Sequence, residues 1–251
     1  MRTRLIFGLI AVAVWATIPS IAGGASTPSM SFSPASLKGT WVWAFEGRLV
    51  RYQYAQLGLA KFDGKGGCTI TLMENSGANG GYDHASNRCT YEVAKNGLGS
   101  IDYALDGEAG AATIAIGPKD IRMTSSDPGN TGDGVLRRAS LVSASELVGR
   151  WTFSMEGTIF GEKLSGAGVM TFNGSGKCSQ SLAYNYGVGE QQVTTDSCTY
   201  ELGETGIGFA DIAYSNGTGG DSYFLTADGM KDLFLLTTAE GEVLYGHGIK
   251  S

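Results

Sequence analysis

The residues of this 251-residue chain that could do chemistry are few, and their spacing matches no catalytic motif. The two histidines, His84 and His247, lie in glycine-rich surroundings and share no sequence context. General acid–base catalysis needs a positioned partner beside such a side chain. The chain has no Gly-x-Ser-x-Gly elbow and no His-Glu-x-x-His pair, which mark nucleophilic and zinc-dependent hydrolysis. We therefore expect no catalytic residues and no enzyme activity.

Carboxylates recur in pairs, which is the other pattern that could support acid–base chemistry. The pairs are Glu46 with Glu156, Glu92 with Glu201, and Asp102 with Asp211. Each carboxylate alternates with large apolar neighbours, and alternate side chains of a strand point to opposite faces. We expect these carboxylates to face solvent.

The four cysteines are expected to form two disulfides. Four cysteines allow three pairings. The midpoint between Cys68 and Cys89, and that between Cys178 and Cys198, falls in a glycine-rich turn. Residues equidistant from a hairpin turn face each other at ~4.5–5.5 Å, a separation that suits a disulfide. We predict the pairs Cys68–Cys89 and Cys178–Cys198. Because no Cys-x-x-Cys is present, we expect no metal and no cofactor.

The elements that carry these residues come in two copies. Leu37-x-Gly39-x-Trp41 returns as Leu147-x-Gly149-x-Trp151, and Phe62-Asp63-Gly64-Lys65-Gly66 returns as Phe172-Asn173-Gly174-Ser175-Gly176. Such a duplication indicates two copies of one structural unit. The Asp-Gly and Asn-Gly steps are typical of tight hairpin turns. A phosphate cradle would need a helix next, whereas a run that begins with cysteine follows.

Each copy divides into about eight short apolar runs separated by turn residues, without helical periodicity. An antiparallel meander of about eight strands can close into a small barrel, which removes exposed edges. The predicted fold is all-β: two tandem small antiparallel β-barrels, at residues 36–139 and 146–251, joined by residues 140–145. The alternative is that both copies contribute to one larger barrel or sandwich.

The first strand of each copy shows which side chains should point inward. Trp41, Trp43 and Phe45 alternate with Val42, Ala44 and Glu46. Trp151 and Phe153 occupy the same places in the second copy. The second run, Leu57–Phe62, has apolar residues in both phases, so alternation does not assign its inner face.

The N-terminus predicts export. Arg2 and Arg4 precede an apolar run, Leu5–Ala16, and Pro19 ends it ahead of small residues. This is the pattern of a signal peptide, which we place at residues 1–25. The run is shorter than the ~20 residues that span a bilayer. We expect a secreted or periplasmic protein.

Charge excludes several kinds of partner. The formal net charge is −6, which argues against nucleic acid and against electrostatic docking on anionic lipid. Strands of an outer-membrane barrel need ~9–11 residues, and most of the runs, such as Trp41–Phe45, are shorter. We expect no membrane insertion and a monomer.

The Gly-x-Trp pair at the head of each meander, Gly39-x-Trp41 and Gly149-x-Trp151, resembles lipocalins and the wider calycin-like barrels. In that family the tryptophan closes one end of a barrel that often holds an apolar ligand, and a late arginine covers it. Arg137 or Arg138 could take that place in the first copy, and Lys250 in the second. The whole repeat also resembles tandem-repeat secreted bacterial β-barrel proteins of uncharacterised function.

The function expected from the sequence is an exported non-catalytic binding protein for a small apolar ligand. The candidate ligand-binding residues are Trp41, Trp43, Phe45, Tyr91, Trp151, Phe153 and Tyr200. The alternative is a protein-interaction module, such as a secreted protease inhibitor or an envelope structural component. That alternative rests on the segment Ser125–Gly134, which we expect to be a longer loop than its counterpart in the second copy, around Ala239–Glu240.

Overall fold

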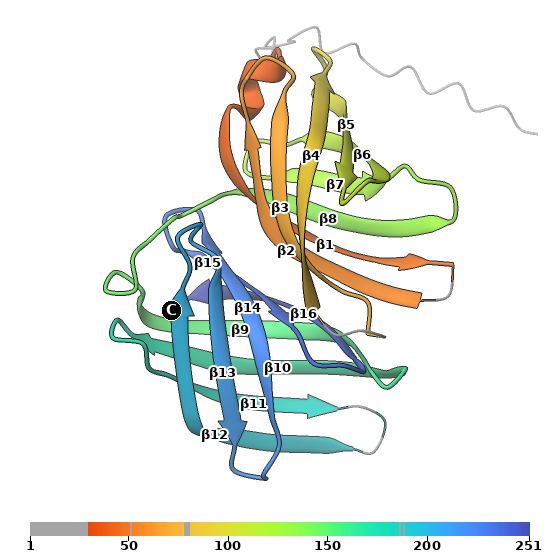
Figure 1. Cartoon of the computed structure of the whole chain (residues 1–251). Helices are drawn as coiled ribbons and strands as arrows, with labels where there is room; N and C mark the ends of the chain where they lie inside the picture. Colours follow the sequence, from red (N-terminus) through yellow and green to blue (C-terminus); the bar gives the residue numbers. More distant parts are fainter. Residues whose placement is uncertain (1–29, 51, 78–80, 186, 188) are drawn as a thin grey trace, which may run out of the picture. The chain divides into compact units, whose positions relative to one another are not determined.

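The chain forms two closed antiparallel β-barrels, one after the other in sequence (Figure 1). The structure is a computed structural model that describes residues 30–50, 52–77, 81–185, 187 and 189–251. The expected signal peptide, residues 1–25, lies outside the described residues. In each barrel the eight strands pair with their sequence neighbours, and the last strand pairs with the first. The predicted all-β fold of two barrels is confirmed, and a single larger barrel is excluded.

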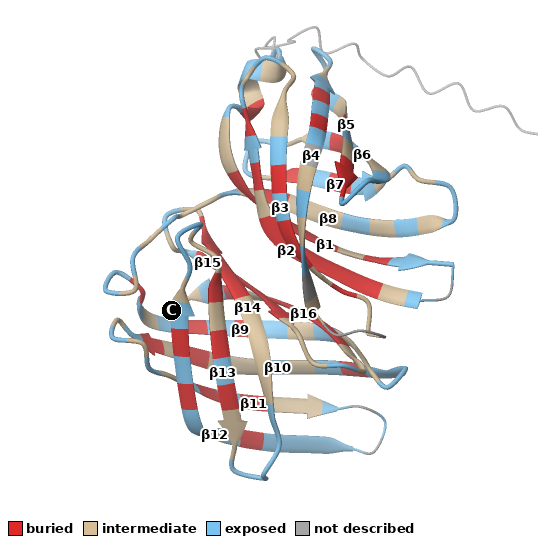
Figure 2. Ribbon diagram, viewed as in Figure 1, coloured by how far each residue is buried: buried red, intermediate tan, exposed pale blue. Residues whose placement is uncertain are grey.

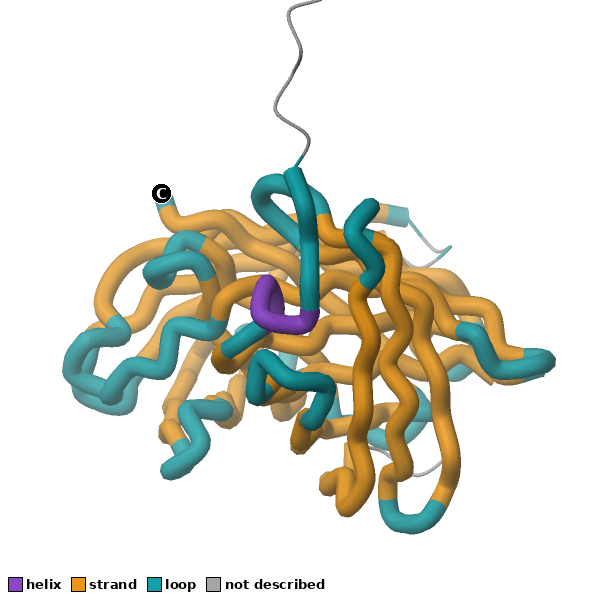
Figure 3. The backbone as a smooth tube through the Cα atoms, turned by 90° about the horizontal axis from the view of Figure 1, so that it is seen from above, coloured by secondary structure: helices purple, strands orange, loops and turns teal. Residues whose placement is uncertain are grey.

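Short turns join the strands within both barrels. The first barrel consists of β1 (Gly39–Leu49), β2 (Tyr52–Phe62), β3 (Cys68–Asn75), β4 (Gly81–Val93), β5 (Leu98–Leu105), β6 (Glu108–Ile116), β7 (Ile121–Ser125) and β8 (Asn130–Arg138). The second consists of β9 (Val148–Ile159), β10 (Glu162–Asn173), β11 (Cys178–Asn185), β12 (Glu190–Leu202), β13 (Gly208–Tyr214), β14 (Gly219–Ala227), β15 (Asp232–Thr237) and β16 (Glu242–Lys250). β4 and β12 each have one register shift where they pair with the next strand. One 3₁₀ turn, η1 (Pro34–Leu37), precedes β1; it is the one helical element among the described residues (Figure 3).

Several strands are longer than the sequence runs predicted. β1 and β2 have 11 residues each, and β4 has 13. The first run was expected to end at Phe45, but Gly47 still pairs with Tyr54 inside the β1–β2 ladder. The argument from strand length against a membrane barrel is therefore wrong, and the absence of membrane insertion stays a prediction. No helix among the described residues is long and apolar enough to span a bilayer.

Each barrel encloses its own apolar core (Figure 2). Trp41, Trp43 and Phe45 of β1 are buried in the first core, as their alternation predicted. Trp151 and Phe153 of β9 are buried in the second. The inward faces of the first strands are thus as expected.

A third apolar cluster joins the two barrels. It contains outward side chains of β1, β2 and β3 together with outward side chains of β14, β15 and β16: Val42, Ala44, Ala55, Leu57, Met73, Leu225, Ala227, Phe234, Leu236 and Val243. We call this set the interface cluster. It explains why β2 showed no alternation, because Leu57 packs outward in the interface cluster while Ala60 and Phe62 pack inward.

The two disulfides are formed as predicted. Cys68 is bonded to Cys89 and Cys178 to Cys198, each with Cα atoms 4.9 Å apart. The β3–β4 ladder pairs Thr71 with Ala85 and is not continued toward the disulfide. Each disulfide therefore joins two strands at a place where their backbone pairing is interrupted.

The repeated Asp/Asn-Gly segment is a turn, as its sequence indicated. The Oδ1 atom of Asp63 accepts the backbone N–H groups of Lys65 and Gly67, at 2.6 and 3.0 Å. Asn173 Oδ1 accepts the equivalent groups of Ser175 and Lys177. These N–H groups are used by the turn itself, which leaves them unavailable to cradle a phosphate.

The expected long loop at Ser125–Gly134 is wrong. β7 ends at Ser125 and β8 begins at Asn130. Gly132, Asp133 and Gly134 are part of β8, and the two glycines are needed because the ring of Phe45 lies against them. A Cβ atom at Gly134 would lie 2.8 Å from that ring.

Candidate functional site

Some of the aromatic residues proposed from sequence close one end of each barrel, namely Trp41 and Tyr91 in the first and Trp151 and Tyr200 in the second. In the first barrel the indole N–H of Trp41 donates to the Leu37 carbonyl at 2.6 Å, and the Tyr91 hydroxyl donates to the Pro34 carbonyl at 3.0 Å. Both bonds attach η1 to the barrel. In the second barrel the Tyr200 hydroxyl bonds the Ala144 carbonyl at 3.2 Å. These side chains have a structural role, because they close the end of the barrel. Trp151 is fully buried.

A cation lies over the tryptophan at each closed end. The Arg138 guanidinium carbon is 4.2 Å from the centre of the Trp41 ring, and Lys250 Nζ is 4.8 Å from that of Trp151. Of the two arginines considered from sequence, Arg138 takes this position. Arg137 instead points to the other barrel.

The opposite end of the first barrel is filled by a chain of polar and aromatic side chains. Trp43 Nε1 donates to Gln56 Oε1 at 3.1 Å, and Gln56 Nε2 donates to Glu74 Oε2 at 2.7 Å. The ring of Tyr103 packs edge-on against Trp43 at 5.5 Å. Tyr54 stacks on Phe45, and its hydroxyl bonds Asn130; burial raises the pKa of that hydroxyl to about 12.

The second barrel has smaller side chains at several of the equivalent places, although Tyr184 and Tyr214 replace the smaller Glu74 and Leu105. Equivalence follows from the shared register: Trp43 lies opposite Gly58 and Leu136, and Phe153 lies opposite Gly168 and Gly248. By the same comparison Gly166 replaces Gln56, Ile212 replaces Tyr103 and Leu164 replaces Tyr54. The space that side chains fill in the first barrel is therefore only partly filled in the second.

A cavity of about 310 Å³ occupies this part of the second barrel. Its wall is mainly apolar, and its lining includes Met155, Ile159, Phe160, Leu164, Leu182, Leu235 and Leu244, with Gln180, Tyr184, Tyr214, Ser222, Thr237 and Glu242 as polar members. None of the residues proposed from sequence as ligand contacts is among the lining residues. Trp151, Phe153 and Tyr200 belong to the core cluster that also includes the lining residues Leu182 and Leu235.

The polar groups of the cavity come from several strands. The Tyr214 hydroxyl of β13 donates to Gln180 Oε1 of β11. Thr237 of β15 accepts the Leu244 backbone N–H at 3.1 Å. Burial raises the pKa of the Glu242 carboxyl. Glu242 occupies the inward phase of β16, two residues before Leu244, and corresponds to Asn130 of the first barrel.

An exposed aromatic ring stands at the mouth of the cavity. Phe160, in the β9–β10 turn, is 81% exposed and has a φ of 48°. Few side chains other than asparagine and aspartate adopt this left-handed conformation. Its backbone N–H donates to the Gly241 carbonyl at 2.6 Å, which holds the turn against the β15–β16 turn. The ring is thus presented to solvent beside the opening.

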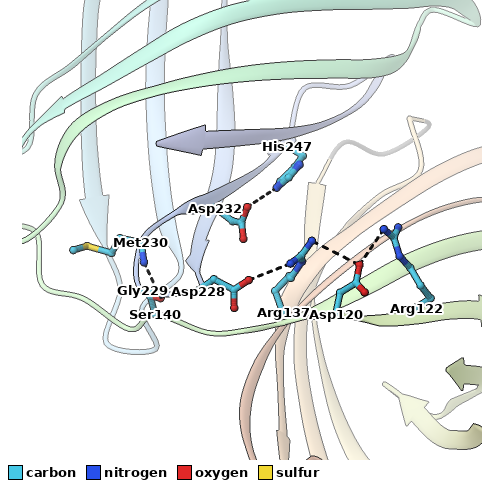
Figure 4. A network of polar contacts seen from close by, with 9 residues as sticks. All are labelled: Asp120, Arg122, Arg137, Ser140, Asp228, Gly229, Met230, Asp232 and His247. Atoms are coloured by element: carbon cyan, nitrogen blue, oxygen red, sulfur yellow. Dashed lines mark hydrogen bonds and ion pairs between the residues drawn. The ribbon is translucent and has the colours of Figure 1, made fainter. Parts of the chain in front are cut away.

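A second concentration of polar groups links the barrels (Figure 4). Arg137 pairs with Asp120 of its own barrel at 3.7 Å and with Asp228 of the other barrel at 3.2 Å. Burial and a hydrogen bond with Asp232 raise the pKa of Asp228. Asp232 is also bonded to His247 Nε2, at 3.0 Å. The contacts made by Arg137 are those of a structural link between the barrels.

The recurring carboxylates are mostly exposed, as expected: Glu92, Glu156, Glu201, Asp102 and Asp211 all face solvent. Glu46 differs, because it is partly buried beside an open cleft of about 920 Å³. Burial, and then the nearby Glu156 and Asp133 carboxylates, raise its pKa. Among the described residues no group of three or more His, Cys, Asp or Glu side chains is arranged to hold a metal ion.

Comparison with known proteins adds little to this geometry. No protein-family model and no curated protein matches the chain. Among solved structures, the crystal structure of kievitone hydratase from Nectria haematococca matches over 87% of this chain and 90% of that chain, with 8% sequence identity and a TM-score of 0.25. A likeness this slight supports no argument about activity.

Proposed function

We propose that this chain is an exported, non-catalytic binding protein whose second barrel holds a small, mainly apolar molecule. One observation carries the proposal: the apolar cavity of about 310 Å³ in the second barrel. Ligand pockets in proteins are mostly apolar, have a few polar groups, and begin at about 300 Å³. The two disulfides are compatible with an oxidising, extracytoplasmic destination.

The first barrel has a different role in this proposal. Its corresponding space is occupied by Trp43, Gln56 and Tyr103, which are bonded or packed to one another. In this proposal no ligand binds near Trp41, Trp43, Phe45 and Tyr91 of the first barrel. In the second barrel the ligand lies against the residues that line the cavity and not against Trp151, Phe153 and Tyr200. The first barrel serves as a filled, rigid partner.

The protein-interaction alternative has lost the observation that favoured it. The β7–β8 connection, residues 126–129, is no longer than the β15–β16 connection, residues 238–241. A secreted inhibitor or envelope role has no specific feature of the described surface to support it.

The test is to fill the cavity with the side chain that the first barrel uses. Leu164 corresponds to Tyr54, and each lies opposite a glycine, Gly157 and Gly47. We expect Leu164→Tyr to fold and to abolish binding of a nine-atom probe such as n-octanol, measured by titration calorimetry and native mass spectrometry. The control is Ser165→Tyr, which adds the same ring on the exposed face of β10. If wild-type protein binds no such probe, or if both variants bind equally well, the proposal is wrong.

A further inference from the structure

The described residues that line the cavity of the second barrel include a negatively charged group and no positively charged one. Among the described lining residues Glu242 is the one carboxylate, and no lysine, arginine or histidine accompanies it. No hydrogen bond or ion pair to its carboxyl group is formed by the described residues. Glu242 is partly buried, and even partial burial of a charge without a partner is unfavourable. Its presence in a mainly apolar cavity whose described lining has no positive charge therefore favours a ligand group that pairs with it.

Two tyrosines share the cavity with this carboxylate. Tyr184 of β11 and Tyr214 of β13 line the same cavity. After burial, the largest influences that raise the pKa of the Tyr214 hydroxyl are the nearby Glu242 carboxylate and Tyr184. A carboxylate flanked by aromatic rings is a favourable environment for an organic cation, because ring faces attract positive charge.

We infer that the second barrel binds an organic cation: an ammonium group on a compact apolar body. The ammonium group pairs with Glu242 beside Tyr184 and Tyr214, and the apolar body lies against Leu182, Leu235 and Leu244. At about 30 Å³ for each water-sized group, the cavity of about 310 Å³ admits a molecule of roughly ten such groups. This inference rests on the proposed function and names its ligand class.

The first barrel offers an internal comparison. At the position of Glu242 it has Asn130, which is already bonded to the Tyr54 hydroxyl at 2.9 Å. The neutral amide completes a filled interior, whereas the carboxylate of the second barrel faces an open one. The carboxylate is thus found in the barrel that has an open cavity for a ligand.

The experiment compares probes of one length that differ in charge: n-octylamine, n-octanol and n-octanoate, titrated into the purified full chain by calorimetry at pH 8. We expect octylamine to bind at least about tenfold more tightly than octanol, because a hydrogen bond to a charged group is worth more than a neutral one. We expect octanoate to bind more weakly than octanol, since Glu242 repels it.

The variant Glu242→Gln should bring the affinity for octylamine down to that for octanol and leave octanol unchanged. The control is Glu240→Gln, which removes an exposed carboxylate just outside the cavity. Wild-type protein gives a second readout that needs no variant. Affinity for octylamine should rise with pH as Glu242 ionises, while affinity for octanol should not. Burial raises the pKa of the Tyr214 hydroxyl of the cavity above its ordinary value, so this group stays neutral across the range.

The outcomes separate the two claims. If octanol binds, Leu164→Tyr abolishes that binding, and octylamine is no tighter, then the cavity is a neutral apolar site and the cation inference is overturned. If octylamine binds more tightly but Glu242→Gln leaves its affinity unchanged, the cation is held elsewhere and the inference is equally wrong. If no probe binds, both the inference and the proposed function are wrong.

Discussion

At position 242 a carboxylate lies where the surrounding cavity offers it no counter-charge. Burial raises the pKa of Glu242 in the folded chain above its value in the unfolded chain. The folded chain therefore holds this proton more tightly than the unfolded chain does. The resulting stabilisation is fully present below the unfolded-state pKa and is lost as the pH rises through the folded-state pKa.

Removing this carboxylate should therefore stabilise the protein, increasingly so at higher pH. We expect the free energy of unfolding of Glu242→Gln to exceed that of wild type by a margin that widens from about pH 5 to pH 8. Urea denaturation across this range measures it. Glu240→Gln should follow the wild-type curve, and parallel curves for wild type and Glu242→Gln would contradict the assignment.

The residues of the candidate site could not be predicted from their types. Met155, Leu164 and Leu235 read as ordinary core residues, because nothing in one strand shows that the opposing side chains are too small to meet them. The informative signal was the difference between copies: Trp43 against Phe153, and Tyr103 against Ile212. A comparison of side-chain volumes at equivalent positions of the two repeats, instead of a search for shared residues, would have pointed to the second barrel.

Among the strands, β1 and β2 are unusual because both of their faces are buried. On β1 the inward Trp43 and the outward Val42 are each almost inaccessible. Alternation still predicted the inner face of β1, since its large aromatics all share one phase. It failed on β2, where Leu57 packs outward on the second barrel. A rule of one buried face per strand cannot anticipate a neighbour that covers the other face.

Strand number and pairing, by contrast, were readable in the sequence. Turn residues separate the runs, the repeat supplies each run twice, and equidistance from glycine-rich turns located the cysteine partners. Strand ends were not readable, because glycines inside strands look like turns. Gly132 and Gly134 pair with β1 and leave room for the ring of Phe45.

The disulfides should matter because they join strands where pairing is interrupted. The bonds span 21 and 20 residues, and closing a loop of that size stabilises a protein by roughly 3 kcal/mol. We expect the double variants Cys68→Ala/Cys89→Ala and Cys178→Ala/Cys198→Ala each to lose about that much stability in denaturant titration under oxidising conditions. Wild-type protein kept in dithiothreitol should lose the sum of the two effects. Unchanged midpoints after reduction would refute this role.

On the scale of the whole molecule, the two barrels behave as one packed unit. The interface cluster buries side chains from both, and Arg137 adds an ion pair to Asp228. Ser140, in the link between the barrels, accepts the backbone N–H groups of Gly229 and Met230. The link is therefore fastened to the second barrel.

Phe234 offers the sharpest test of this coupling, because its ring is 1% exposed and belongs to the interface cluster. We expect Phe234→Ala to reduce the free energy of unfolding by about 3–5 kcal/mol, the usual loss for a buried phenylalanine. It should also separate the unfolding of the two barrels in differential scanning calorimetry. Phe160→Ala, which truncates an 81% exposed ring, should leave both the midpoint and the shape of the transition unchanged. Equal effects of the two substitutions would show that the interface cluster does not couple the barrels.

The identical cross-strand register of the barrels gives the experimenter an internal calibration. A side chain can be transplanted between halves at positions whose backbone partners already agree, as Leu164→Tyr does. Each molecule thus contains both the altered barrel and the unaltered barrel, and the properties of both are measured under the same conditions. In a duplicated protein whose two copies share one strand register, side chains can be exchanged between the copies. The unaltered copy in the same molecule is then the reference for the altered one.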